Sequence, residues 1–527
     1  PSEFNYKRYL KIKNIYLQAY VDDYAWEKIS EKHGNKIMIF ASGLRQNLLK
    51  LLDKSNLEKN ENAVISAILL GVSDKLDPEL SQQYASAGVS HILCVSGMHV
   101  GVIYMIVNYL LFFLSKGRIQ KSIKTIVLLL IIWLYACVTG LSPSVMRAST
   151  MFTFMAFGHL FERKPNTYNS ILTSLFFLCC LNPLIIYEVG VQLSYSAVFG
   201  IVWLQKPIKT IYKTKTKVGK HIWEIMAVSF VAQLLTFPFS MYYFHQFPTY
   251  FLLANIAIIS LTPFVVGTGI LYLVLSFWTW THEYLSLLLN YMIKSMNYVV
   301  SFVEKLPFST LGNLYINSTQ LLLLYACILC FAFAILYKRK FYFFISLFSI
   351  SAILFINLHH KNKNLHSHEM IIYSINKGYV MDCICGHTAY TMGDSTSLLD
   401  NKKHEYHTEN YRIKKGIKNQ QQITDDFKNK RLYKSKNYIQ FCNTSLLVVD
   451  NRIYFENNTP EKLKIDYLLI DNNPNVKINN LLKMIDANTI IFTTNNSYFK
   501  TNVWKKECDS LKIAYHDLRE GHKKIML

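Results

Sequence analysis

The sequence has few charged residues for its length. Only 17% of its 527 residues are charged and 51% are hydrophobic, whereas soluble domains carry about 25% charged residues. The apolar residues form repeated runs between residues 92 and 358, each of about 16 to 30 residues and therefore long enough to cross a bilayer. This composition excludes a wholly soluble globular protein and predicts a polytopic α-helical membrane protein with soluble pieces at both ends.

Several chemical signatures are also absent. The 10 cysteines have no repeating spacing and most lie in apolar runs, so neither a disulfide framework nor a zinc motif is predicted. Cys383 and Cys385 share one face of an expected strand, where such neighbours pair poorly. No Walker-type loop occurs, so any transport needs a partner motor in the cytoplasm or another way to make strand motion directional. The chain starts at Pro1 without a signal peptide, and we expect a fragment of a longer protein.

Acidic residues are scarce relative to basic ones. The chain has 56 Lys+Arg against 34 Asp+Glu, a formal net charge of +22. Membrane proteins collect Lys and Arg in cytoplasmic loops, but an excess of positive charge also suits a polyanionic partner such as nucleic acid. Composition leaves both explanations open. Basic residues cluster in four segments: 116–124, 162–164, 206–220 and 337–340.

The apolar runs predict about ten membrane spans. They lie near 92–114, 125–140, 146–161, 170–187, 189–204, 223–244, 250–278, 285–303, 320–337 and 341–358. With these spans all four basic segments fall on one side, which the positive-inside rule makes cytoplasmic. Both soluble ends then lie on the outer face, in the periplasm if an outer membrane exists. Without the tenth span, the C-terminal domain would be cytoplasmic.

The ends of the chain have a different character. The polar, aromatic segment 1–34 includes an alternating run at 15–21 that predicts a strand. The segment 36–53 predicts an amphipathic helix, either interfacial with Arg45 and Lys50 at the headgroups or on the surface of a soluble domain. The expected domains are 1–34, 35–90, 91–358 and 365–527. The last is an α/β domain with strands at 370–384, 387–394, 445–455 and 489–495, a helix at 474–485, and loop, helix or both at 400–437.

Polar residues and helix-breaking residues interrupt several of the apolar runs. Buried polar groups are tolerated in a bilayer mainly where protein or water covers them. They therefore predict a pathway between helices, although helix–helix hydrogen bonding without transport gives the same pattern. The candidate residues are His91, Ser96, Gly97, His99, Gly101, Ser142, Pro143, Arg147, Gln192, Ser194, Gln233 and Asn255.

Two histidines flank the start of the first run. His91 is interpreted as an entrance residue near the headgroups, whereas His99 is expected about two turns inside the span. Ser96 shares a face with His99 on an ideal helix, and Gly97 with Gly101 forms a GxxxG pair that admits another backbone. No carboxylate lies nearby in sequence to complete a catalytic triad. The segment is therefore interpreted as a channel wall.

Two of these stretches also carry a family resemblance. SAGVSHILCVSGMHVGV (86–102) and GLSPSVMRAS (140–149) resemble the signature segments of the ComEC competence family, and PSEFNYKRYL is similar to part of that family's outer-face OB-fold domain. The resemblance implies an inner-membrane channel that admits one strand of transforming DNA, with the earlier spans and most of the OB-fold missing here. It also implies an outer-face DNA receptor and cytoplasmic helicase and single-strand-binding proteins as partners.

The C-terminal domain departs from the family pattern. Many members end in a metallo-β-lactamase-like domain with an HxHxDH cluster, which this sequence lacks. Where the family has histidines, this chain has Asp471, Asn472, Asn473 and Pro474, and asparagine is a poor transition-metal ligand. His404 and His407 lack an obvious third ligand. We therefore expect a degenerate fold with no metal, no cofactor and no nuclease activity; the alternatives are a membrane-bound metal-dependent hydrolase or a transporter of a small anionic solute.

Overall fold

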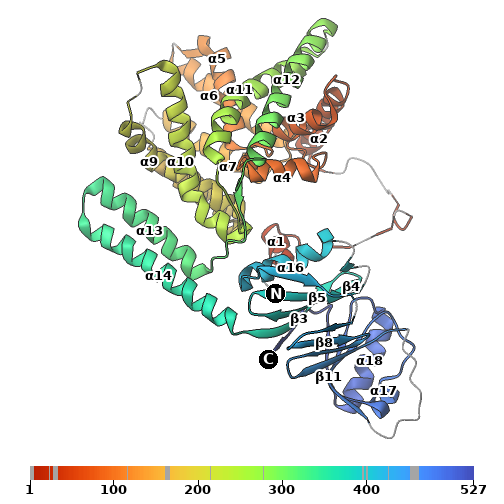
Figure 1. The fold of residues 1–527 in the computed structure, drawn as a ribbon. Helices are drawn as coiled ribbons and strands as arrows, with labels where there is room; N and C mark the ends of the chain where they lie inside the picture. The colour runs from red at the N-terminus through yellow and green to blue at the C-terminus, as the bar shows by residue number, and fades with distance from the viewer. Residues whose placement is uncertain are drawn as a thin grey trace. The chain divides into compact units, whose positions relative to one another are not determined.

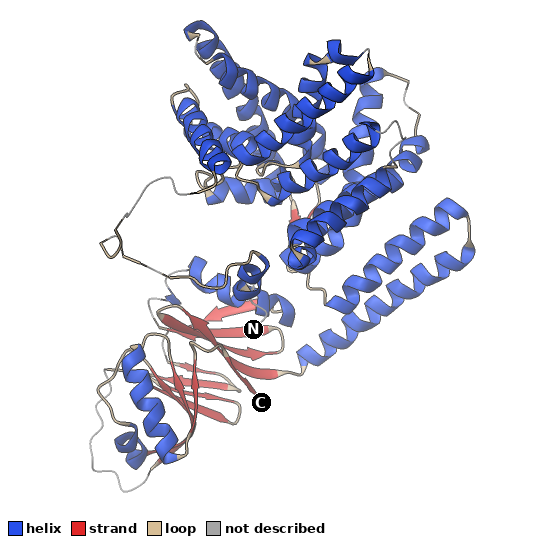
Figure 2. Cartoon of the chain, turned by 180° about the vertical axis from the view of Figure 1, so that it is seen from behind, coloured by secondary structure: helices blue, strands red, loops and turns tan. Residues whose placement is uncertain are grey.

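The computed structural model describes most of the chain in two compact units (Figure 1). It describes residues 5–19, 21–22, 24–27, 34–115, 117–160, 166–213, 215–276, 278–394, 397–398, 401–424, 426–451 and 462–527. The first unit, residues 6–350, is almost entirely helical. The second, residues 351–527 with Asn5, begins within the helix Lys340–Leu365 that starts in the first unit, and it contains two β-sheets (Figure 2).

The helical unit contains a helix at every one of the expected spans. Its elements are α1 (Tyr6–Ile12), α2 (Lys36–Asp53), α3 (Lys59–Leu70), α4 (Pro78–Ser86), η1 (Ser90–Ile92), α5 (Gly97–Leu110), η2 (Phe112–Ser115), α6 (Arg118–Val138), α7 (Pro143–Leu160), α8 (Thr167–Leu181), η3 (Pro183–Tyr187), α9 (Val189–Ile211), α10 (Lys217–Phe244), α11 (Phe251–Leu275), α12 (Thr279–Glu304), α13 (Ser318–Tyr337) and α14 (Lys340–Leu365), with a two-stranded ladder of β1 (Phe247–Pro248) and β2 (Thr310–Leu311).

Five helices are long and apolar enough to cross a membrane. Among the described residues these are α6, α10, α11, α13 and α14, while α5 and α8 are apolar but shorter. The length and composition of these helices support a membrane protein, and the count of ten spans stays a prediction.

Two predictions in the N-terminal part are wrong. The first span does not begin at Ile92, because Ser96 has an extended backbone (φ −118°, ψ 172°) and α5 starts only at Gly97. The expected strand is not formed by residues 15–19 and 21–22, which follow α1 without regular structure. The helix over 36–53 is confirmed as α2, but its Arg45 is directed inward and donates to the carbonyl of Gly71 at 3.0 Å.

The core of the helical unit lies where α3 and α4 pack against α11 and α12. Almost all of α3 from Ala63 to Leu70 is buried, so this helix lies inside the unit rather than on its surface. Gly88 shows how tightly these elements meet. Its φ is +78°, and a Cβ there would lie 2.9 Å from both Phe251 and Pro248, so glycine is required on both counts.

The second unit is built from two sheets. The five-stranded sheet has the order β14-β3-β4-β5-β6 and the seven-stranded sheet the order β13-β12-β11-β10-β9-β8-β7. Its elements are β3 (His368–Ile375), β4 (Gly378–Cys385), β5 (Thr388–Gly393), α16 (Asn401–Lys415), β6 (Asn419–Gln422), β7 (Phe427–Lys428), β8 (Leu432–Ser435), β9 (Tyr438–Phe441), β10 (Thr444–Val449), β11 (Leu463–Ile470), α17 (Ile478–Met484), β12 (Ile485–Phe492), α18 (Tyr498–Leu511), β13 (Ala514–Asp517) and β14 (Lys523–Met526).

The alternation of side chains along β3 explains the layers. Met370 and Ile372 face the other sheet and join a core shared by both, whereas Ile371, Tyr373 and Ile375 face the opposite way, toward α16. On the far side, α17 and α18 cover the seven-stranded sheet. The result is a helix–sheet–sheet–helix arrangement, which confirms the α/β prediction. The expected strands and helix are present as β3, β4, β5, β10, β12 and α17, and residues 452–455 of the third expected strand lie outside the described residues.

Candidate functional site

Five helices of the first unit pack in a closed cycle. Each packs against the next in the order α5, α7, α9, α10, α11, and α11 returns to α5. We call these the ring helices. All the predicted site residues except His91 lie on the ring helices or directly before one of them. His91 lies in η1 and is exposed.

His99 closes the N-terminus of α5. Its Nδ1 accepts the backbone N–H of Ser96 at 2.9 Å, and the Ser96 hydroxyl lies 2.9 Å from the same nitrogen. His99 therefore lies in the first turn and not two turns inside, which corrects the prediction. Since Nδ1 accepts, a neutral ring carries its proton on Nε2, and that atom is buried with no hydrogen-bond partner among the described residues.

The glycine pair on α5 faces α7, as its spacing predicts. A Cβ on Gly97 would lie 3.5 Å from the Cβ of Ala148, and one on Gly101 would lie 3.8 Å from the ring of Phe152. Residue numbers rise together along both helices, so α5 and α7 run parallel and start at the same end of the ring.

Arg147 lies in the second turn of α7 and is only 4% exposed. Its Nη2 donates to Ser144 Oγ at 3.0 Å, while Nε and Nη1 are buried without a partner among the described residues. Both Nη atoms lie 3.6 Å from the Cβ position of Gly190, in the first turn of α9, and Glu188 Oε1 lies 3.9 Å from that position. Burying guanidinium donors without partners costs free energy, so a hydrogen-bond acceptor placed beside Nε and Nη1 would stabilise this cation.

Gln192 ties the start of α9 to the end of α10. Its Oε1 accepts from the hydroxyl of Tyr243 at 2.9 Å, and its Nε2 donates to the carbonyl of Ile186 at 3.0 Å. The start of α11 follows α10 after a short connection, so α11 also begins at this end. Asn255, one turn into α11, is 6% exposed and its Oδ1 has no partner among the described residues.

The remaining predicted residues divide between this end and the middle of the ring. Pro143 is the first residue of α7, and the hydroxyl of the preceding Ser142 is buried and without a partner in the described part of the chain. Ser194 is half-buried near the start of α9. Gln233 is half-buried in the middle of α10, away from the other candidates along the helix axis.

The N-termini of α5, α7, α9 and α11 thus meet at one end of the ring, which we call the mouth. Each helix N-terminus carries a partial positive charge and unpaired amide donors. His99, Arg147, Gln192 and Asn255 lie in their first two turns. Of the basic segments, the described residues 206–211 form the opposite end of α9, and residues 162–164 lie outside the described residues. Chemically, the mouth is suited to an anion that passes between helices.

The position where the resemblance expects metal ligands is held by amides. Asn473 Oδ1 accepts from the backbone of Ser497, its backbone N–H donates to Asn496 Oδ1 at 2.9 Å, and its Nδ2 donates to the carbonyl of Asn495 at 3.3 Å. Among the described residues no group of three or more His, Cys, Asp or Glu side chains is placed to hold a metal. The residues present do not fit a two-metal site.

Asp471 keeps a carboxylate at this place. Burial raises the pKa of this carboxyl group, and the charge of the nearby Asp394 raises it further. Hydrogen bonds from Thr493 Oγ1 (2.6 Å) and Asn495 Nδ2 (3.0 Å) oppose this rise without cancelling it. Its lone pairs are used by protein donors, so the side chain stabilises the loop after β11.

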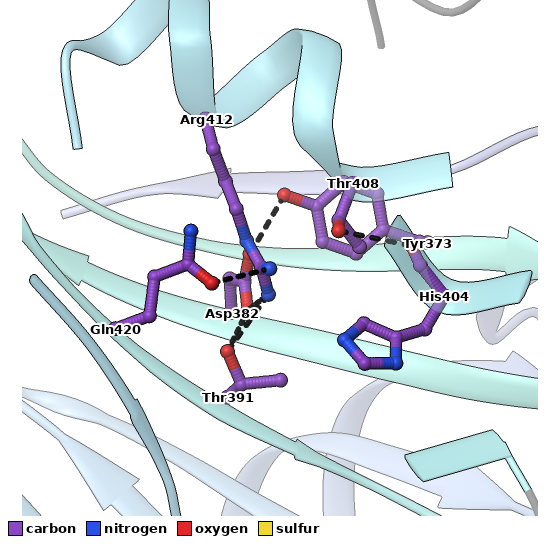
Figure 3. A network of polar contacts seen from close by, with 7 residues as sticks. All are labelled: Tyr373, Asp382, Thr391, His404, Thr408, Arg412 and Gln420. Carbon is purple, nitrogen blue, oxygen red and sulfur yellow. Dashed lines mark hydrogen bonds and ion pairs between the residues drawn. The ribbon is translucent and has the colours of Figure 1, made fainter. Parts of the chain in front are cut away.

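A buried polar network holds α16 on the five-stranded sheet (Figure 3). Arg412 makes two bonds of 2.8 Å to the carboxylate of Asp382, one from Nε and one from Nη2. The hydroxyls of Thr391 and Tyr373 also donate to the carboxylate of Asp382, at 2.7 Å and 3.0 Å respectively. Arg412 donates from Nη1 to Gln420 Oε1 at 3.0 Å. His404 lies beside the network, and Thr408 donates to its carbonyl at 2.9 Å. His404 and His407 are thus presented by a helix fixed in place, and neither belongs to a metal cluster of the described residues.

Two residues at the mouth were missed by the sequence analysis. Glu188 stands in EVGVQLSY as an acidic residue before an apolar run, which is a usable signal. Tyr243 belongs to an aromatic-rich stretch in which no pattern separates it from its neighbours, and only packing selects it.

Comparisons with known proteins agree with this division of the chain. A family model described as Competence protein matches residues 68–341, and one described as ComEC C-terminal domain matches residues 370–524. ComE operon protein 3 of Bacillus subtilis (strain 168) is 28% identical over 269 residues, which are 51% of this chain and 33% of that relative. The aligned part thus covers about a third of the relative. No solved structure matches.

Proposed function

Because the chain belongs to the Competence protein family, whose model matches residues 68–341, we propose that its ring helices form the conduit for one strand of DNA during natural competence. The conduit lies in the cytoplasmic membrane, with the mouth on the outer face and the basic segments on the cytoplasmic face. The family resemblance implies an outer-face DNA receptor, a cytoplasmic helicase and single-strand-binding proteins as partners, and the sequence has no motor motif of its own.

The observation that carries this proposal is the mouth. Arg147 is buried with two guanidinium nitrogens unpartnered among the described residues, at the convergence of four helix N-termini. A phosphate supplies the acceptors that Arg147 lacks and is favoured by the helix dipoles. His99, whose Nδ1 accepts the Ser96 N–H, and the uncharged amide of Asn255 lie at the same end, so the attraction for phosphate comes from Arg147 and the helix dipoles.

A transformation assay with charge-changing variants tests this role. We expect Arg147→Gln to lower transformation by about tenfold or more, which corresponds to about 1.4 kcal/mol. Arg147→Lys should lower it less, because lysine keeps the positive charge but lacks the two-pronged hydrogen bonding of the guanidinium group. Membrane level and protease resistance are measured in parallel to separate misfolding from lost function.

Arg45→Gln is the matched control. Arg45 is a partly buried arginine on α2, in the same unit but outside the ring, and it donates to the backbone carbonyl of Gly71. It is expected to leave transformation per inserted protein unchanged. Normal transformation by Arg147→Gln at normal membrane level would remove the mouth from the mechanism. Loss of phosphate uptake rather than DNA uptake would favour a small-anion transporter.

The C-terminal domain is proposed to lack nuclease activity. The support is the amide-filled loop at Asn472 and Asn473 in place of metal ligands. Incubation of the purified full chain with labelled DNA and Mn²⁺ or Zn²⁺ tests this directly. Metal-dependent cleavage that survives Asn473→Ala and is lost in His404→Ala would establish a hydrolase with a different ligand set.

A further inference from the structure

The C-terminal unit has a hollow of about 520 Å³ at one edge of its sheets. It is lined by Tyr373, Ser374, Asn376, His407, Thr494, Arg519, Glu520, Gly521 and His522. These residues come from β3 and the following turn, α16, the segment after β12 and the segment between β13 and β14. Its volume is within the range of sites for small ligands and suits about one nucleotide.

The charge lining this hollow is mainly positive or ionisable to positive. Arg519, His407 and His522 contribute to it, and among the described residues that line the hollow the one carboxylate is that of Glu520. Glu520 is paired with Lys505 at 2.8 Å, and Lys505 also lies 2.8 Å from Asp517, so one lysine charge is shared by two carboxylates. An anionic group entering the hollow meets Arg519, which lines it directly, while Glu520 is engaged by Lys505.

Arg519 is oriented by two contacts. One of its Nη atoms donates to the carbonyl of Asn496, and its guanidinium lies 5.8 Å from the centre of the Tyr498 ring. A guanidinium has five N–H donors, so most remain for an acceptor in the hollow. The aromatic ring attracts the guanidinium electrostatically at this distance.

Tyr498, which lies near Arg519, and the following residue Phe499 have large aromatic side chains that are open to solvent. Tyr498 is 71% exposed and Phe499 is 79% exposed, both in the first turn of α18. Exposed rings beside a cationic hollow are the combination by which proteins hold single-stranded nucleic acid, with phosphate on the cation and bases on the rings.

The loop that replaces the metal-ligand motif supports this turn. Asn473 accepts from the N–H of Ser497, the N-cap of α18, and its N–H donates to the side chain of Asn496. Asn496 in turn provides the carbonyl for Arg519. The asparagines thus connect the former ligand position to the aromatic turn and to the cation.

We propose that this hollow is a metal-independent binding site for single-stranded DNA, with a phosphate on Arg519 and a base on Tyr498. The identity of the ligand rests on the proposed role in DNA uptake, whereas the site itself rests on the geometry of α18 and the hollow. The site gives the C-terminal domain a task that needs no nuclease chemistry.

Fluorescence anisotropy on the full chain in nanodiscs tests the site. The probe is a labelled oligothymidylate of about 12 nucleotides, titrated with EDTA present so that metals play no part. All variants carry Arg147→Gln, so that the mouth does not contribute. We expect Arg519→Ala and Tyr498→Ala each to weaken binding by about tenfold, and Tyr498→Phe to retain it because the ring is kept.

Lys506→Ala is the control, since it removes one exposed positive charge from the same helix, on a later turn. We expect its affinity for the oligonucleotide to stay within about twofold of the parent's, because losing one positive charge weakens binding only through the general electrostatic attraction to phosphate. Equal affinity of Arg519→Ala, Tyr498→Ala and the parent would overturn the site without touching the transformation result for Arg147. Complete competition by inorganic phosphate alone would also overturn it, in favour of a phosphate site that does not read a strand.

Discussion

A Cβ on Gly200 of α9 would lie 2.8 Å from Cγ of Leu235 on α10. The two helices therefore touch where position 200 has no side chain, and their packing closes one side of the ring. In a bilayer the hydrophobic effect does not drive helices together, because the lipid tails are as apolar as the side chains. Helices there associate through close packing, which small residues such as glycine permit.

Gly200→Ala is predicted to destabilise the helical unit by about 1–3 kcal/mol, because the branch carbon of Leu235 must move. Gly267→Ala on α11 is the control, since a Cβ there meets nothing within 4 Å, and alanine favours the helix by about 0.5–1 kcal/mol. Thermal unfolding in detergent measures both. A Gly200→Ala protein as stable as Gly267→Ala would mean that the helices are farther apart.

Gly97→Leu is predicted to abolish transformation, whereas Gly97→Ala keeps it. A Cβ at this position meets Ala148 at an ordinary 3.5 Å, but the rest of a leucine side chain extends into α7. The measurement is transformation frequency normalised to membrane-inserted protein. Equal activity of the leucine and alanine variants would contradict the contact between α5 and α7.

His99→Ala is predicted to cost about 0.5–2 kcal/mol of stability, because the Ser96 N–H loses its acceptor at the start of α5. Transformation should fall further than this loss of stability alone explains if the imidazole lines the conduit. His99→Asn, which can still accept from the Ser96 backbone, separates capping from lining. Full activity of His99→Ala at normal protein level would leave His99 a purely structural cap.

Arg412→Met is predicted to destabilise the C-terminal domain by about 3–5 kcal/mol, because it leaves the carboxylate of Asp382 buried without its cation. The double variant Asp382→Asn with Arg412→Met should recover part of the loss, since no charge remains buried. Scanning calorimetry of the full chain measures the transition of this domain. A double variant less stable than Arg412→Met alone would show that the pair is not coupled in this way.

Glu369 is predicted to make the C-terminal domain sensitive to acid. Burial alone would raise its pKa, but hydrogen bonds from Tyr411 (2.6 Å), Lys415 (2.9 Å) and Lys524 (3.0 Å) outweigh it, and the pKa is lowered. With the folded pKa below the unfolded value of about 4.3, this stabilisation is present above that pH and is lost as pH falls through the folded pKa.

Glu369→Gln should therefore lower the thermal midpoint of the domain at pH 7 and bring it closer to the parent toward pH 3.5. The measurement is the difference between the two midpoints across that range. A difference that stays constant with pH would contradict the assignment, because a purely steric defect does not titrate.

Much of the fold could be predicted because hydrophobic length and period are local properties. The helices α5 to α14 coincide with the apolar runs, and α2 with the amphipathic run at 36–53. The start of α5 could not be predicted in this way, since Ile92 and Leu93 are apolar but belong to the turn before Ser96. Apolar residues mark burial, and burial does not distinguish a helix from a packed turn.

The candidate residues themselves were recognised from the sequence, but their grouping was not. Arg147, Gln192 and Asn255 each stand as a polar residue in an apolar run, so each can be recognised from its own stretch of sequence. Only the packing of α5, α7, α9, α10 and α11 brings four helix N-termini to one end. The aromatic turn at Tyr498 gave no sequence signal, because exposure of a ring is decided by the surrounding elements.

By itself, therefore, the sequence determined a polytopic membrane protein with a mixed α/β end, because span length, charge bias and strand alternation need no tertiary contact. Tertiary structure alone decided which polar groups remain without partners and which cations face a hollow. The contacts that decide these points, between Arg147 and Gly190 and between Arg519 and Tyr498, join separate segments of the chain. No local pattern encodes such a contact, since it exists only after both segments have been packed.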